Sequence, residues 1–159
     1  MDKVRLSPVI FENLIKHLVN IEEEKEKLLE QYFPRPSKER SDLEKLFDNY
    51  IRQVEQLIKN AIKSETTNTN LPIVIFGSEV EVENLDTGEI SRFRIVSPFD
   101  IDVESGDISY LSPMGRSLLL KRTGDEVTVH APAGVFRYKI QSIKFPSSPI
   151  DSKNTPSKT

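Results

Sequence analysis

The chain has 159 residues, of which 36% are hydrophobic and 30% are charged. Its 22 Lys and Arg residues against 25 Asp and Glu residues give a net charge of -3. Free nucleic acid is therefore a poor candidate for the primary partner, because phosphate binding requires clustered basic charge. The absence of cysteine excludes disulfides, a thiol nucleophile and cysteine-ligated metals. No apolar run is long enough to cross a bilayer, and the N-terminus lacks a cleavable leader pattern, so we expect a soluble cytoplasmic protein.

Residues 7–31 show the pattern of an amphipathic helix. Ser7 is a favourable N-cap, and Pro8 suits the first helical position, where its missing N–H costs nothing. Seam residues recur at alternating steps of three and four: Phe11, Leu14, Leu18, Ile21, Lys25, Leu28 and Tyr32. This spacing predicts one helix of a two-helix coiled coil, with a seam interrupted by a single lysine. His17 is expected on the flank of this helix.

A second helix is predicted after a short basic interruption. Pro34 and Pro36 end the first helix, since neither can continue the ladder of hydrogen bonds. Ser41-Asp-Leu-Glu44 is typical of a capping box, so we expect the second helix to begin at Ser41. Its seam consists of Leu43, Phe47, Tyr50, Val54, Leu57 and Ala61. Two seams joined by a short turn predict an antiparallel hairpin, a coiled-coil finger over residues 1–66 with its tip near residues 33–44.

In the second half of the chain, hydrophobic residues recur at every second position, which is the pattern of β-strands. After a linker at residues 67–73, strands are expected at residues 80–85, 90–95, 107–111, 126–131 and 135–144, with a turn at Asp86-Thr87-Gly88. A short helix is expected from Pro113 to Lys121. The sequence therefore predicts an α+β fold, in which the hairpin precedes a small antiparallel sheet domain with one helix at residues 74–145. Residues 146–159, rich in proline and serine, are expected to form a disordered tail.

No motif of a self-contained enzyme is recognisable. The two histidines, His17 and His130, lie in different halves, and Ser112 has no histidine near it in the sequence. Metalloprotease, nucleophile-elbow, P-loop and dinucleotide-binding patterns are absent. We therefore expect a protein that is not an enzyme and that has no cofactor of its own.

Seven short stretches of the second half occur in a specific order. They are Val74-Ile-Phe-Gly-Ser-Glu-Val80, Leu85-Asp-Thr-Gly-Glu89, Arg94-Ile-Val96, Gly106-Asp-Ile-Ser109, Ser112-Pro-Met-Gly-Arg-Ser-Leu118, Gly124-Asp-Glu-Val127 and Ala131-Pro-Ala-Gly134. Together they resemble the C-terminal domain of the GreA/GreB transcript cleavage factors, and the N-terminal finger resembles the same family by its architecture. The resemblance implies an FKBP-like fold for residues 74–145.

The resemblance also implies a partner and a mechanism. Members of this family dock the C-terminal domain on the rim of the secondary channel of bacterial RNA polymerase, and the coiled coil enters the channel. Acidic residues at its tip help to hold a second Mg²⁺ and a water in the polymerase active centre, so that a backtracked transcript is cut. The expected partners are therefore RNA polymerase and the nascent RNA 3′ end, with no membrane, and the only metal is the Mg²⁺ of the polymerase.

The tip departs from the family pattern. Where the family usually shows Asp-Leu-x-Glu-Asn, this chain reads Asp42-Leu43-Glu44-Lys45-Leu46. Asp42 is the candidate Mg²⁺ ligand, Glu44 is a second candidate for assisting catalysis, and Lys45 replaces the usual glutamate. Structural roles are also open, because Asp42 suits the first turn of a helix and Glu44 suits a capping box.

Two further groups of residues follow from the resemblance. Arg35, Lys38 and Arg40 either contact RNA or solvate an exposed tip. Ser112, Pro113, Met114, Gly115 and Arg116 match the family loop that meets the polymerase, and they also suit an ordinary strand-to-helix turn. The main hypothesis is an elongation factor that stimulates transcript cleavage by the polymerase. The alternatives are a regulator that occupies the channel without efficient cleavage and an interaction module that has lost polymerase binding.

Overall fold

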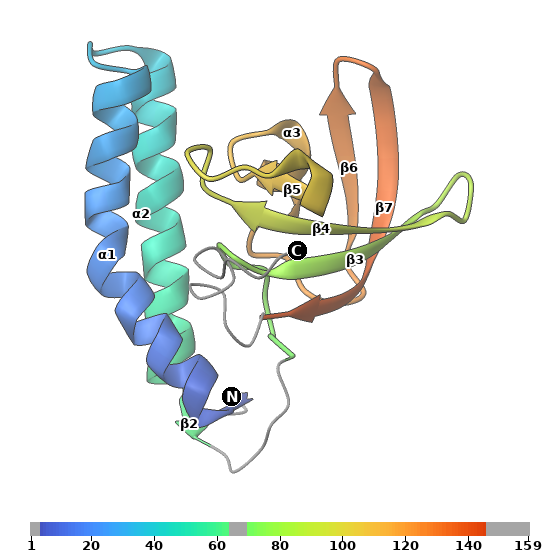
Figure 1. The fold of residues 1–159 in the computed structure, drawn as a ribbon, viewed down its shortest axis with the longest axis horizontal. Helices are drawn as coiled ribbons and strands as arrows, with labels where there is room; N and C mark the ends of the chain where they lie inside the picture. Colours follow the sequence, from blue (N-terminus) through green and yellow to red (C-terminus); the bar gives the residue numbers. More distant parts are fainter. Residues whose placement is uncertain (1–3, 64–69, 146–159) are drawn as a thin grey trace. The chain divides into compact units, whose positions relative to one another are not determined.

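The structure, a computed structural model, describes residues 4–63 and 70–145 (Figure 1). The chain divides into two compact units, Met1–Asn68 and Thr69–Thr159. The expected tail at 146–159 and part of the expected linker lie outside the described residues. No helix within the described ranges has an apolar stretch that could cross a membrane.

The first unit is a helical hairpin. Helix α1 (Pro8–Tyr32) begins as predicted, with Pro8 in its first turn and the Ser7 hydroxyl accepting a hydrogen bond from the Ile10 N–H at 3.3 Å. Helix α2 (Lys38–Lys59) packs against it along its length (Figure 1). The predicted seam of α2 is confirmed, since its buried residues are Leu43, Phe47, Tyr50, Val54 and Leu57.

The seam of α1 is broader than the sequence predicts. Its buried residues are Ile10, Leu14, Ile21, Leu28 and Leu29. Tyr32, predicted in the seam, is 46% exposed, and Phe11 and Leu18 are half-buried. Lys25 occupies its seam position with its side chain only 17% exposed, and its ammonium lies 3.8 Å from Asp48 on α2. An apolar face wider than a strict coiled-coil stripe is typical of helices in globular units.

A pair of short strands that the sequence did not predict closes the open end of the hairpin. Strands β1 (Val4–Leu6) and β2 (Ala61–Lys63) pair in parallel. Ala61, predicted in the helical seam, therefore begins a strand, because α2 ends at Lys59 with Asn60 as its C-cap. The Lys63 ammonium contacts Glu12 at 3.2 Å and lies 5.1 Å from the ring centroid of Phe11. These contacts join the end of the hairpin to the start of α1.

His17 lies in the hairpin seam and not on its flank. Its Nε2 atom is 2.7 Å from the hydroxyl of the fully buried Tyr50, and the two rings meet edge to face. Burial lowers the pKa of His17 from 6.5 to about 4, because the charged imidazolium would lose its hydration there. The neutral imidazole is therefore the form that the seam accommodates.

The second unit is a five-stranded sheet with order β5-β4-β3-β7-β6 (Figure 1). The elements are β3 (Glu79–Asn84), β4 (Ile90–Val96), the 3-10 turn η1 (Val103–Ser105), β5 (Asp107–Ser109), α3 (Pro113–Leu118), β6 (Glu126–Ala131) and β7 (Gly134–Lys144). Three of the neighbouring pairs are antiparallel as expected, whereas β4 and β5 run parallel. The two-part α+β fold is confirmed, with a mixed rather than a purely antiparallel sheet.

The two faces of this sheet differ in chemistry, as the period of two requires. One face carries the core, which includes Val80, Val82, Ile95, Val127, Val129, Ile140 and Ile143. On the other face, the glutamates of β3 lie between basic residues of the neighbouring strands. Glu81 pairs in register with Arg92 of β4, and Glu83 pairs with Lys139 of β7. Opposite charges at directly paired positions favour this register.

The corner from β5 into α3 requires a glycine. Ser112 caps α3, because its hydroxyl accepts a hydrogen bond from the Gly115 N–H at 3.0 Å. A Cβ atom on Gly115 would lie 2.1 Å from the carbonyl oxygen of Ser109 and 2.9 Å from the Cα atom of Tyr110. The helix can therefore lie this close to the preceding strand only with glycine at this position.

The seam histidine makes hairpin stability depend on pH. The pKa of His17 is lower in the folded protein than in the unfolded chain, so the unfolded chain binds the proton more readily. The contribution of the neutral His17 side chain to the free energy of unfolding is complete above about pH 6.5. It decreases as the pH falls toward 4. We expect a loss of about 1–2 kcal/mol between pH 7 and pH 5 in urea unfolding followed by circular dichroism. His17→Leu should lose this part of the pH dependence, and an equal dependence in both proteins would contradict the assignment.

The close packing around Gly115 predicts that adding one methyl group there lowers the stability of the sheet unit strongly. Gly115→Ala should destabilise the sheet unit by about 3 kcal/mol, because the clash is with backbone atoms and not with the end of a flexible side chain. Gly88→Ala is the matched control. Gly88 has a positive φ of 78° but open space around it, so we expect a cost of only about 1 kcal/mol. Equal effects of the two substitutions on urea unfolding would show that the close approach at Gly115 does not matter.

Candidate functional site

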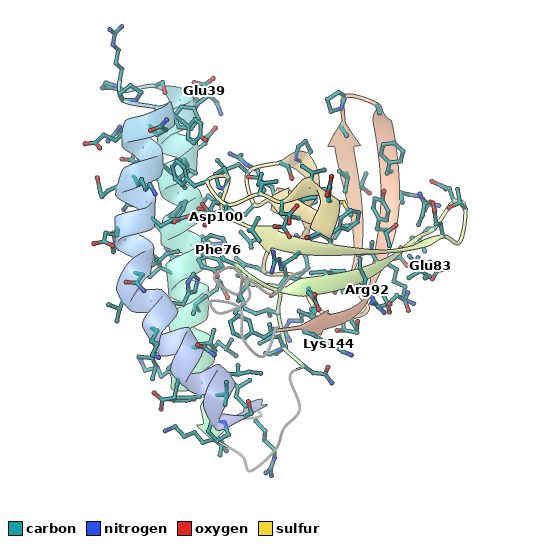
Figure 2. The ribbon with its side chains drawn as sticks, in the orientation of Figure 1. Glu39, Phe76, Glu83, Arg92, Asp100 and Lys144 are labelled. Carbon is teal, nitrogen blue, oxygen red and sulfur yellow. The ribbon has the colours of Figure 1, made fainter. Side chains whose placement is uncertain are left out.

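The tip of the finger is the five-residue connection at residues 33–37 between α1 and α2. Phe33 ends α1, and its N–H donates to the Leu29 carbonyl at 2.9 Å. Ser37 begins α2, and its hydroxyl accepts from the Arg40 N–H at 3.0 Å. Figure 2 marks this end of the finger by Glu39, which lies in the first turn of α2.

The prediction that α2 begins at Ser41 is therefore wrong by one turn. Ser37 has the extended backbone of an N-cap, and Ser41 lies inside the helix, with its N–H bonded to the Ser37 carbonyl. Two i, i+4 ion pairs support the additional turn, from Lys38 to Asp42 and from Arg40 to Glu44. Glu44 is consequently not part of a capping box, and Asp42 is not a first-turn residue.

The position of the two tip carboxylates within α2 separates them. Successive residues of a helix are rotated by about 100°, so Asp42 and Glu44 point about 200° apart. They therefore extend from nearly opposite sides of α2 and do not face one common ion. No group of three metal-ligating side chains that could hold a metal occurs in the described part of the chain.

Asp42 lies between two lysines on one side of α2. The Lys38 ammonium is 3.0 Å from the Asp42 carboxylate, and this hydrogen bond raises the pKa of Lys38. Lys45, three residues after Asp42, projects from the same side and is exposed. The side chain of Asp42 remains 44% exposed, so it is accessible despite the ion pair.

The three predicted RNA-contacting residues of the tip have different surroundings. Arg35 is exposed and makes no ion pair or hydrogen bond among the residues that the structure describes. Lys38 is 83% exposed, although it pairs with Asp42. The Arg40 side chain is only 29% exposed, and its Nη1 atom donates to the Phe33 carbonyl at 2.6 Å. The three cations of the tip therefore differ in how accessible their charges are to a partner.

The corner at residues 109–116 is the second candidate site. The Ser112 hydroxyl donates to the Ser109 carbonyl at 2.7 Å, and the Leu111 N–H donates to the Ser109 hydroxyl at 2.9 Å. Tyr110, between them, is fully buried and stacks on Phe76 with ring centroids 4.0 Å apart. These interactions fix the backbone of the corner. Pro113 and Arg116 remain exposed and Met114 remains half-buried, so the corner presents these side chains at the surface.

A buried ion pair that the sequence did not reveal fixes the segment before this corner. Arg94 of β4 donates to both oxygens of Asp107, at 2.8 and 3.0 Å, and the Asp107 side chain is completely buried. These hydrogen bonds raise the pKa of Arg94. Asp107 also accepts from the Asp102 N–H at 3.0 Å and so holds the segment that contains η1. The two residues are thirteen positions apart, and only the parallel pairing of β4 and β5 brings them together.

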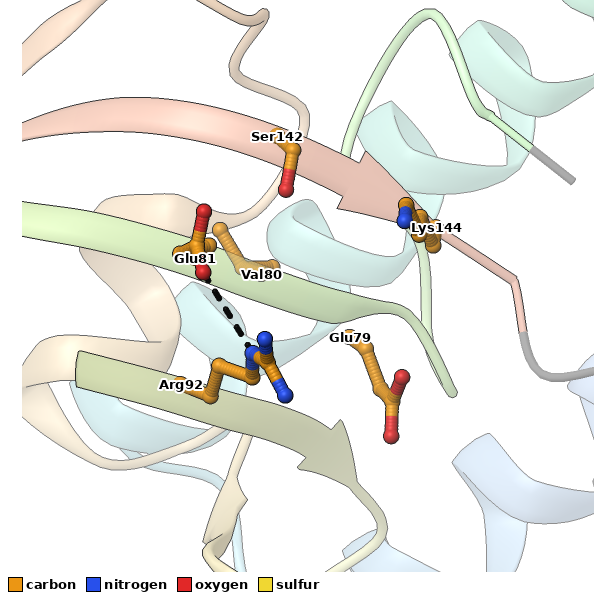
Figure 3. Close-up of a pocket in the computed structure, with 6 residues that line it drawn as sticks. All are labelled: Glu79, Val80, Glu81, Arg92, Ser142 and Lys144. Atoms are coloured by element: carbon orange, nitrogen blue, oxygen red, sulfur yellow. Dashed lines mark hydrogen bonds and ion pairs between the residues drawn. The ribbon is translucent and has the colours of Figure 1, made fainter. Parts of the chain in front are cut away.

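A polar hollow of about 220 Å³ lies on the exposed face of the sheet (Figure 3). It is lined by Glu79, Val80, Glu81, Arg92, Ser142 and Lys144. Arg92 lies 3.4 Å from the Glu81 carboxylate, and Glu79 projects from β3 at the side of the hollow (Figure 3). The mixed charges are those of a solvated sheet face, and His130 lies on a different strand, β6, outside the set that lines the hollow. None of the residues predicted from the sequence to be functional lines it.

Comparison with known proteins gives a family match for the second unit. Residues 68–145 match the family model for the C-terminal region of the transcription elongation factors GreA and GreB. The chain is 38% identical over 95 residues to the transcription elongation factor GreA of Thermodesulfovibrio yellowstonii. This match covers 60% of each protein, so the chain spans less than two thirds of that relative.

Other relatives match over more of their length. The transcription elongation factor GreA of Thermotoga sp. strain RQ2 is 36% identical over 158 residues, which cover 90% of this chain and 98% of the relative. Among solved structures, Gfh1 of Thermus aquaticus covers 91% of this chain and 99% of its own, at 28% identity and a TM-score of 0.42. A GreA/GreB factor from Nitrosomonas europaea covers 90% of this chain and 100% of its own, at 24% identity and a TM-score of 0.48. On the sequence matches, which extend through both units, the chain belongs to the GreA/GreB family of transcription elongation factors.

Proposed function

We propose that the protein binds bacterial RNA polymerase, acts from its secondary channel and weakly stimulates transcript cleavage in backtracked complexes. Membership of the GreA/GreB family supports polymerase as the partner. The shape of the hairpin supports the proposal that it enters a channel. Only five residues connect α1 to α2, so the tip of the hairpin is narrow.

The observation that carries the cleavage proposal is the exposure of Asp42 near the tip. Its carboxylate is the one acid of the tip that matches the family pattern, and it projects from α2 with 44% of the side chain exposed. A carboxylate brought to an open metal site can raise the occupancy of Mg²⁺ and orient the attacking water. In this proposal, Asp42 supplies one ligand and the polymerase supplies the others.

The surroundings of Asp42 explain why the stimulation is expected to be weak. Lys38 pairs with its carboxylate at 3.0 Å, and Lys45 adds a second positive charge on the same side of α2. Positive charges a few ångströms away oppose the recruitment of another cation. Glu44, on the far side of the helix and 3.7 Å from Arg40, cannot replace the missing glutamate. Arg35 and Lys38, as the more exposed cations, are the proposed contacts to RNA phosphates.

The same charges favour one alternative function. If the two lysines prevent Mg²⁺ from binding at Asp42, the finger occupies the channel without promoting cleavage. The protein would then slow elongation rather than rescue backtracked complexes. The family relationship to elongation factors holds in both cases.

Substitutions at the tip distinguish these functions. In a cleavage assay on stalled elongation complexes, Lys45→Glu should raise the rate at least tenfold, because it replaces a repelling charge with a carboxylate facing the same side as Asp42. Asp42→Asn should abolish the Mg²⁺-dependent stimulation without weakening polymerase binding. Glu55→Gln and Arg52→Glu, at exposed positions further along α2, are the matched controls and should leave the rate unchanged. Strong cleavage by the wild type with no gain from Lys45→Glu would refute this account, whereas slowed elongation without cleavage in both proteins would establish the alternative.

Docking on the polymerase is expected to involve the corner before α3. Met114→Asp should weaken binding to core polymerase at least tenfold in a pull-down titration, because it places a charge among the surface side chains that the corner presents. The fold should persist, since Met114 is only half-buried. Val135→Asp, at a residue 59% exposed on β7, is the control in the same unit and should bind normally. Unchanged affinity of Met114→Asp would move the docking surface away from this corner.

A further inference from the structure

Arg40 differs from the other cations of the tip in what it contacts. Its main-chain N–H donates to the Ser37 hydroxyl at 3.0 Å, which caps α2. Its guanidinium donates through Nη1 to the Phe33 carbonyl at 2.6 Å, on the far side of the connection. Its Nε atom lies 3.7 Å from the Glu44 carboxylate, one turn further along α2. One residue thus joins the end of α1 to the first two turns of α2.

The end of α1 needs such a contact. The last carbonyls of a helix have no partner within it and carry a partial negative charge, which basic side chains in the last turn usually neutralise. The last turn of α1 contains no basic residue, and it includes Glu30, whose charge has the wrong sign for this position. The positive charge that the end of α1 lacks comes from Arg40 of the following helix.

The contact also depends on the shape of the arginine side chain. The guanidinium is planar and carries separate donors on Nε and Nη, so it can bond the Phe33 carbonyl while its other edge faces Glu44. A lysine ammonium has a single nitrogen and cannot occupy both places. The limited exposure of Arg40, at 29% against 83% for Lys38, agrees with an internal role.

We infer that Arg40 is a positioning residue that fixes the shape of the finger tip, and not a contact to RNA. It holds the connection at residues 33–37 against the start of α2, through the Phe33 carbonyl on one side and Glu44 on the other. The consequence for activity rests on the proposed function, in which the tip must reach the polymerase active centre with Asp42 correctly placed.

The experiment compares Arg40→Lys, which keeps the charge, with Arg40→Gln, which removes it. Arg52→Lys is the matched control, because it makes the same conservative change at an exposed residue of α2 that lies outside the tip. Hydrogen exchange of the full-length protein reports on the tip through the amides of Phe33, Arg40 and Ser41, which are hydrogen-bonded there. Polymerase affinity and the maximal effect on stalled complexes at saturating protein are measured separately.

If Arg40 positions the tip, both of its variants should exchange these amides about tenfold faster, since a hydrogen bond from a charged group is lost. Both should bind polymerase with wild-type affinity and show a reduced maximal effect, whether cleavage or slowed elongation. Arg52→Lys should match the wild type in every measurement. A purely structural loss of the hairpin would instead lower the affinity and speed exchange along both helices.

Two results would overturn the inference. Wild-type exchange and activity in Arg40→Lys, with lost activity in Arg40→Gln, would show that the charge alone matters, as expected for a contact to RNA phosphate. Unchanged exchange in both variants would show that Arg40 does not hold the tip. If the wild-type protein does not bind polymerase, the proposed function fails, and the exchange measurements still decide whether Arg40 positions the tip.

Discussion

The finger depends on a reversal of the chain within five residues. At this reversal the negative end of the α1 dipole lies beside the positive end of the α2 dipole, which is a favourable arrangement in itself. Pro34 and Pro36 restrict the backbone dihedral angles of the connection, so less conformational entropy is lost when it becomes ordered. One unpaired group at each helix end is then satisfied locally, the Arg40 N–H by the Ser37 hydroxyl and the Phe33 carbonyl by the Arg40 guanidinium. A narrow tip is possible because so few residues complete both helix ends.

The start of α2 determines the electrostatics of the tip. Because the helix begins at Lys38, both tip carboxylates have a cation one turn before them. Exposed pairs of this kind contribute only about 0–1 kcal/mol in water, so Lys38 does not lock Asp42 away from a metal ion. In a confined site with a lower effective dielectric constant, however, the same charges interact several times more strongly. Under the proposed function, the balance between attraction of Mg²⁺ by Asp42 and repulsion by its two lysines would therefore be set inside the polymerase.

Several features could be predicted from the sequence because they depend on local pattern. The two helices, the seam of α2, the Ser112 cap and the strand positions follow from periodicity and capping chemistry. The sequence pattern misplaces the start of α2, because Ser41 offers a better match to a capping box, whereas Ser37 has the extended backbone that a cap needs. The pairing of β1 with β2, the parallel β4–β5 pair and the Arg94–Asp107 contact depend on register between distant segments, and no single stretch of sequence encodes that register.

The corner before α3 shows why a motif shared with a family needs a structural explanation for each of its residues. Ser112 is required as the cap of α3, and Gly115 is required by the close approach of the helix to Ser109. Their presence follows from the fold alone, whatever the domain binds. Pro113 and Arg116 are exposed and Met114 is half-buried, so their side chains reach the surface. In the proposed docking, the outward-facing residues would therefore make the contacts, and the backbone that Ser112 and Gly115 fix determines how those residues are presented.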